Sequence, residues 1–85
     1  TTYINLAVLM SEHGNSDSAL AYGIKAKNLS LADNNKIGLF EAYDLIAKIY
    51  HQKGAEDSAY FYLRLHSELA RELEAIEEKA ATATI

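Results

Sequence analysis

The sequence repeats itself at a spacing of 40 residues. Many residues of the first half recur in the second half, and the pairs Leu6/Ile46 and Leu9/Ile49 are conservative matches in the same register. The identical pairs are Tyr3/Tyr43, Ala7/Ala47, Gly14/Gly54, Asp17/Asp57, Ser18/Ser58, Ala19/Ala59, Tyr22/Tyr62 and Leu29/Leu69. A fixed period of about 20 to 50 residues is typical of proteins built from stacked structural units. We therefore expect a stacked-repeat architecture, which offers an extended surface rather than a reaction centre.

Composition favours a small all-α domain. The chain has 85 residues, no proline and only four glycines, which suits helices throughout. Cysteine is absent, so disulfides and thiolate metal sites are excluded. The net charge is −4 and Lys and Arg form no cluster, so we expect no nucleic-acid binding by this segment. No apolar run approaches the roughly 18 residues of a membrane span, so we expect no membrane binding by this segment either.

Apolar spacing predicts four helices in two antiparallel pairs, over about 2–13, 16–31, 35–53 and 56–79. Gly14 and Gly54 are expected to end the first and third helices, and Ser16 or Asp17 to cap the second. The side chains expected to face inward on the middle two helices are Ala19, Tyr22, Gly23, Ala26, Leu29, Leu39, Phe40, Tyr43, Ile46, Ala47 and Tyr50. On the last helix the side chains expected to pack within the repeat are Ala59, Tyr62, Leu63, His66 and Leu69.

The helices divide into two repeats, about 2–33 and 35–70, with the last helix extended to about 79. Together they form one domain over 1–79, followed by a flexible tail over 80–85. The chain begins with threonine, and the helical pattern is already under way at Tyr3. We therefore expect a fragment of a longer protein.

The repeated positions resemble those of the tetratricopeptide repeat family over nearly all of residues 2–70. The first repeat aligns with the family pattern at Tyr3, Leu6, Ala7, Met10, Gly14, Ala19 and Gly23, and the second at Tyr43, Ile46, Ala47, Tyr50, Gly54, Ala59 and Leu63. The family's later aromatic is Gly23 in one repeat and Leu63 in the other, and its second-helix alanine is Ala26 in the first repeat but His66 in the second. In addition, no proline closes either repeat, and the period is 40 rather than 34. The longer period resembles a variant found in bacterial sensor kinases and transcriptional regulators.

The resemblance implies that a protein or peptide binds along a concave surface lined by the first helix of each repeat. The lysine and asparagine clamp of chaperone-binding members is absent, since the corresponding positions hold Ile4, Asn5, Val8, Asp44, Leu45 and Lys48. The candidate groove residues are Ile4, Val8, Glu12, Glu41, Asp44, Lys48 and His51. The expected function is a non-enzymatic interaction scaffold within a larger bacterial signalling or transcription-regulatory protein. A cytoplasmic location is favoured, and a periplasmic sensor region is also compatible.

The last helix supports an alternative function as a dimerisation or linker module that transmits a signal. Its apolar surface is wider than one neighbouring helix covers, and apolar residues continue from Leu69 at intervals of four, three and four. A further repeat or a second copy of the chain would cover this surface, so a homodimer through the last helix is a second expectation. The candidate association residues are Tyr60, Phe61, Leu65, Leu69, Leu73 and Ile76.

Residues with chemical potential favour structural roles instead. His13, His51 and His66 lie on different predicted helices, so they are weak metal ligands. Asp17-Ser18 and Asp57-Ser58 recur at helix starts, where capping explains them better than nucleophilic catalysis does. Tyr3, Tyr22, Tyr43 and Tyr62 occupy equivalent positions and are expected in the core. We therefore expect no catalytic site, metal or cofactor.

Overall fold

The computed structural model describes the backbone of residues 2–83 and the side chains of residues 3–75. Over residues 2–83 it contains four helices: α1 (Thr2–Glu12), α2 (Ser16–Ala32), α3 (Lys36–Gln52) and α4 (Glu56–Ala83). The predicted all-α fold is confirmed, and the first three helices end within two residues of their predicted bounds. Ile76 of the predicted association surface lies outside the described side chains.

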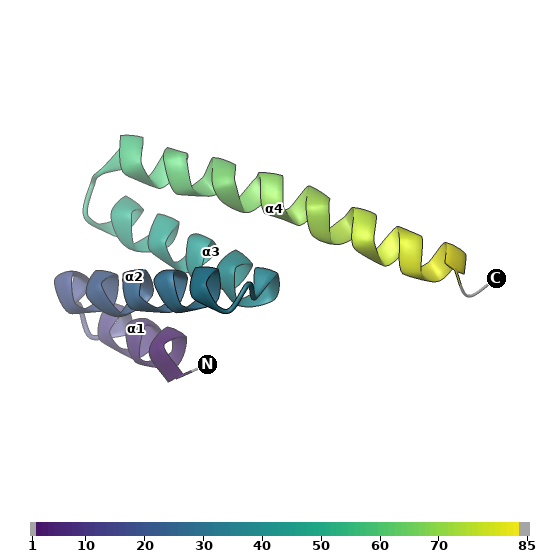
Figure 1. The fold of residues 1–85 in the computed structure, drawn as a ribbon. Helices are drawn as coiled ribbons and strands as arrows, with labels where there is room; N and C mark the ends of the chain where they lie inside the picture. Colours follow the sequence, from purple (N-terminus) through teal and green to yellow (C-terminus); the bar gives the residue numbers. More distant parts are fainter. Residues whose placement is uncertain (1, 84–85) are drawn as a thin grey trace.

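Each helix packs against the next one along the chain (Figure 1). Short turns join the helices, so neighbours run antiparallel. α1 also contacts α3, so the first helices of the two halves lie beside each other. This arrangement places α3 against three helices. α4 packs on α3, and Lys27 of α2 also lies over its Tyr62 ring, 5.7 Å from the ring centroid.

The three turns between helices share one conformation, repeated every 20 residues. Gly14, Asn34 and Gly54 have φ angles of +78°, +54° and +80°, the left-handed geometry that ends many helices. In each turn the next backbone N–H donates to a carbonyl five residues earlier, which satisfies a free helix terminus. These bonds are Asn15 N to Met10 O at 2.8 Å, Asn35 N to Ser30 O at 2.8 Å and Ala55 N to Tyr50 O at 2.9 Å.

Asparagines cap the second and third helices. The side-chain oxygen of Asn15 accepts a hydrogen bond from the Ser18 backbone N–H at 3.4 Å, and Asn35 accepts one from Gly38 at 3.0 Å. The predicted cap at Ser16 or Asp17 is wrong, because Ser16 is already the first residue of α2. Asp17 lies in the first turn, where its carboxylate complements the positive end of the helix dipole.

The core forms where α1, α2 and α3 meet. Ala7, Ala19, Leu45 and Ile49 make one buried cluster, and the repeated alanines allow the helices to approach closely. α2 lies close to α3 at Gly23, where an added Cβ would lie 3.2 Å from Ile46 Cγ1. The small residues therefore set the spacing between the two repeats.

Several predicted core positions need correction. Leu29 was expected to face inward but is 52% exposed. Four buried residues of α3, Ala42, Leu45, Ile46 and Ile49, follow the i, i+3, i+4, i+7 spacing of one helix face, and Ala47 is also buried. Leu39, Phe40, Tyr43 and Tyr50 are only half-buried.

We predict that Gly54→Ala lowers the free energy of unfolding by about 1–2 kcal/mol, because alanine is strained at positive φ. No heavy atom lies within 4 Å of a Cβ built at Gly54, so a clash would not explain the loss. The matched control is Asn34→Gly in the equivalent turn. It removes a side chain from positive φ, so we expect it to lower the free energy of unfolding by at most a few tenths of the loss in Gly54→Ala. Urea unfolding followed by circular dichroism measures both, and equal losses would contradict the shared turn conformation.

α4 is the longest element, with 28 residues against 17 in α2 and α3. It ends at Ala83 rather than near Lys79, so residues 80–83 of the predicted tail are helical. Figure 1 shows its C-terminal half extending past the other helices. Over the described residues, no helix combines the length and the apolar character that crossing a membrane requires.

Candidate functional site

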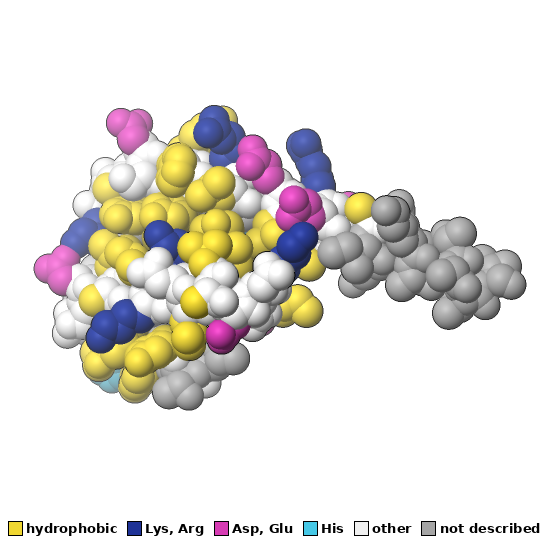
Figure 2. All heavy atoms as spheres, in the orientation of Figure 1, with side chains coloured by type: hydrophobic (Ala, Val, Ile, Leu, Met, Phe, Trp, Pro, Cys, Tyr) yellow, Lys and Arg dark blue, Asp and Glu magenta, His cyan; other side chains and the backbone are white. Residues whose placement is uncertain are grey.

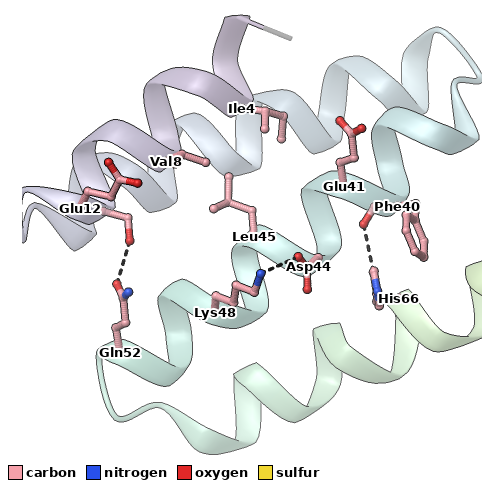
Figure 3. Close-up of a pocket in the computed structure, with 11 residues that line it drawn as sticks. Ile4, Val8, Glu12, Phe40, Glu41, Asp44, Leu45, Lys48, Gln52 and His66 are labelled. Atoms are coloured by element: carbon pink, nitrogen blue, oxygen red, sulfur yellow. Dashed lines mark hydrogen bonds and ion pairs between the residues drawn. The ribbon is translucent and has the colours of Figure 1, made fainter.

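A groove of about 500 Å³ lies between α1 and α3, with α4 at one end (Figure 3). Its volume is within the range usual for ligand pockets. It is lined by Ile4, Val8, Ser11, Glu12, Phe40, Glu41, Asp44, Leu45, Lys48, Gln52 and His66.

Six of the seven groove residues predicted from the sequence line this groove together; His51 does not. The lining residues of α3 follow a stripe along one face, and His51 lies beside that stripe, towards the start of α4. Its Nδ1 lies 2.9 Å from a carboxylate oxygen of Glu56. His51 therefore links the end of α3 to α4.

Sequence reasoning missed some lining residues. Ser11 and Gln52 join α1 to α3, because the Ser11 hydroxyl donates to the Gln52 side chain at 2.9 Å. The helical stripe through Asp44 and Lys48 leads to Gln52 four residues on, so the spacing contained this signal. Phe40 and His66 had been assigned to the core, and only the packing of α4 places His66 at the groove.

The floor of the groove is apolar. Ile4 and Val8 from α1 and Leu45 from α3 point toward one another (Figure 3). Leu45 is 9% exposed, whereas Val8 is 38% exposed. The floor therefore rests on the core and still presents apolar surface to an incoming side chain.

The rim of the groove carries more negative than positive charge. Glu12, Glu41 and Asp44 are acidic, and Lys48 is the one Lys or Arg in the lining. Lys48 Nζ lies 3.0 Å from Asp44, four residues earlier on α3. This pair neutralises Asp44, so Glu12 and Glu41 give the groove its net negative charge.

An aromatic pair closes the groove at α4. The rings of Phe40 and His66 stack with centroids 4.0 Å apart and an angle of 22° between the planes. His66 Nδ1 also lies 3.1 Å from the Phe40 carbonyl oxygen. This carbonyl orients the half-buried imidazole and fixes the end of the groove.

The four repeated tyrosines form two equivalent pairs outside the groove. Tyr3 and Tyr22 have ring centroids 6.1 Å apart, and Tyr43 and Tyr62 have centroids 6.0 Å apart. Tyr3 was expected in the core, but it is 37% exposed and therefore only partly buried. Desolvation raises the pKa of Tyr43, and neighbouring Tyr62 adds to this effect.

Asp17 binds across the repeat boundary. Lys53 donates a hydrogen bond to its carboxylate, and this bond together with the charge of Lys53 lowers the pKa of Asp17. The pairing gives Asp17 a structural role at the α2–α3 junction. Among the described side chains, no three histidine, aspartate or glutamate residues converge in a way that could hold a metal ion.

The predicted association surface on α4 is only partly exposed. Tyr60 and Phe61 are 69% and 48% exposed, whereas Leu65 and Leu73 are half-buried. Leu69 is 6% exposed, which agrees with the expected packing within the repeat, so its assignment to the association surface is wrong. Leu63 was also expected to pack within the repeat, but it is 47% exposed.

A second hollow of similar volume lies near the α2–α3 turn. Polar and small residues supply much of its lining, and the exposed Leu29 also lines it. The hollow is lined by Tyr3, Ile4, Ala26, Leu29, Ser30, Asp33, Asn35 and Gly38. Only Asp33 is charged, so it offers fewer fixed charges to a ligand than the α1–α3 groove does.

The geometry places the chain among all-α proteins with stacked antiparallel helix pairs. Comparison with protein-family models, curated proteins and solved structures gave no match.

Proposed function

We propose that the chain is a non-enzymatic scaffold that binds a polypeptide segment of a partner protein in the α1–α3 groove. One observation carries this proposal: six residues predicted from the sequence repeat line a single groove that has an apolar floor. The sequence resemblance to tetratricopeptide repeats supports a protein partner, and it is also the ground for proposing a role in bacterial signalling or transcription regulation.

The groove chemistry suggests the kind of segment that binds. An aliphatic or aromatic side chain fits between Ile4, Val8 and Leu45, where burial favours association. A lysine or arginine beside it would meet the carboxylate of Glu12 or Glu41 at the rim. We therefore propose a short segment that combines an apolar anchor with a basic residue.

Random peptides displayed on phage and selected on the immobilised chain test this proposal. We expect the enriched sequences to share an apolar residue near a lysine or arginine. Fluorescence anisotropy should show that Val8→Glu weakens their binding about tenfold or more, which corresponds to about 1.4 kcal/mol. Glu41→Gln should weaken binding less and reduce its dependence on salt.

Leu31→Glu is the matched control, because Leu31 is 54% exposed on α2 and does not line the groove. We expect its affinity to stay within about twofold of wild type. Peptides that bind Val8→Glu as tightly as wild type would contradict the groove proposal, and so would a selection that enriches nothing.

A second candidate function is the dimerisation or linker module that the sequence suggested. The length of α4 and its extension past the other helices favour this candidate (Figure 1). In that case Val8→Glu would leave function intact, whereas substitutions on α4 would abolish it.

A further inference from the structure

The two ends of the helix stack expose the residue positions that its interior buries. Inside, Gly23 of α2 is buried against Ile46 and Ile49 of α3. Moving 40 residues along from Gly23 gives Leu63, which is 47% exposed, and moving 40 residues back from Ile49 gives Leu9, which is 48% exposed. Figure 2 shows hydrophobic side chains at the surface over α1 and between α2 and α4.

The polar contacts between the two repeats have complementary counterparts at the two ends of the stack. Inside the stack, Ser11 bonds to Gln52. Moving 40 residues along from Ser11 gives His51 at one end, and moving 40 residues back from Gln52 gives Glu12 at the other end. An imidazole N–H donates well to a carboxylate. His51 uses Nδ1 for Glu56 and retains Nε2 for such a contact.

The interior ion pair between Asp17 and Lys53 has the same kind of counterpart. The shift of 40 residues gives Asp57 at one end and His13 at the other, again a carboxylate and an imidazole. His13 Nδ1 lies 2.8 Å from its own helix carbonyl at Leu9, so Nε2 is the nitrogen that would face Asp57.

The apolar residues of the groove floor correspond to polar residues at both ends of the stack. Inside, Leu45 shares the groove with Ile4 and Val8. At the ends the corresponding residues are Asn5 on one side and the ion-paired Asp44 and Lys48 on the other. At each of the positions named above, the residues at the two ends of the stack therefore match each other in polarity, although they differ from the interior residues.

We propose that a second copy of this chain docks head to tail, with its α1 on the outer faces of α3 and α4. The contact reproduces the way in which α3 packs on α1 and α2. Leu63 and Tyr60 of one copy then meet Leu6 and Leu9 of the next. The contact is heterologous, so a dimer still has a free α1 end on one copy and a free α4 end on the other. Association therefore continues beyond the dimer.

Sedimentation velocity on the wild-type chain should show an average mass that rises from low to high micromolar concentration and exceeds the mass of a dimer. Leu63→Glu and Leu9→Glu should each raise the dissociation constant about tenfold or more. Both residues are about half exposed, so far-UV circular dichroism should show folded variants. Leu31→Glu on α2 is the control and should associate as wild type does.

Mixing the two variants separates this proposal from pairing between α4 helices. Leu9→Glu keeps a working α4 end and Leu63→Glu keeps a working α1 end, so an equimolar mixture should form dimers and no larger species. A wild-type chain that stays monomeric would overturn the proposal. So would a Leu9→Glu variant that associates like wild type, because α1 would then take no part.

Discussion

Replacing Ile49 with alanine lowers the free energy of unfolding by about 2–5 kcal/mol. The side chain is fully buried in the cluster with Ala7, Ala19 and Leu45, so its loss leaves a cavity where three helices meet. Small domains unfold at a cost of only about 5–15 kcal/mol, so this single change removes a large part of the stability. The melting temperature should fall by about 8 °C or more, measured by circular dichroism or calorimetry.

Leu9→Ala is the matched control, because Leu9 holds the position of Ile49 in the first repeat and is 48% exposed. We expect it to change stability by less than about 1 kcal/mol when measured at concentrations where the chain is monomeric. Equal losses in the two variants would show that the α2–α3 boundary is not where the core lies.

Leu69→Glu unfolds the chain or destabilises it by at least about 3 kcal/mol. Leu69 is 6% exposed, so the substitution removes buried apolar area and places a carboxylate in the same space. Neutralising the carboxylate does not restore the lost packing, so the variant stays destabilised in mild acid. Urea unfolding monitored by tyrosine fluorescence measures the loss.

Leu63→Glu on the same helix provides the control, since 47% of Leu63 is exposed. Its unfolding free energy should stay within about 1 kcal/mol of wild type at concentrations where the chain is monomeric. A stable Leu69→Glu variant would return Leu69 to the surface of α4 and contradict the packing of α4 on α3.

The helices and turns could be predicted because they depend on local sequence. Gly14 and Gly54 end helices through a backbone conformation that glycine adopts freely, and Asn34 adopts it in the middle turn. The caps at Asn15 and Asn35 were also predictable in principle, because both asparagines follow these turn residues at a spacing of 20.

The side chains of α4 could not be placed from the sequence in the same way. Its apolar residues cover more than one face, so periodicity alone does not decide between Leu63 and Leu69. The orientation of α4 on α3 buries Leu69 and exposes Leu63. The same orientation brings His66 to the groove and turns His51 toward Glu56.

The groove residues were largely predictable because α1 and α3 are equivalent helices of a repeat. Ile4 and Val8 have the same positions as Asp44 and Lys48, so one helix provides an apolar wall and the other a charged one. The apolar floor was harder to predict, because Leu45 replaces Asn5 at the position that joins groove to core.

Chemical-shift mapping of a selected peptide on the ¹⁵N-labelled chain shows which helices the peptide contacts. We expect the largest shifts on the groove-lining parts of α1 and α3, around Val8 and Lys48, and we expect Val8→Glu to reduce them at the same peptide concentration. Shifts centred on Tyr60 and Leu63 of α4 would contradict binding in the groove, because the peptide would then bind outside it.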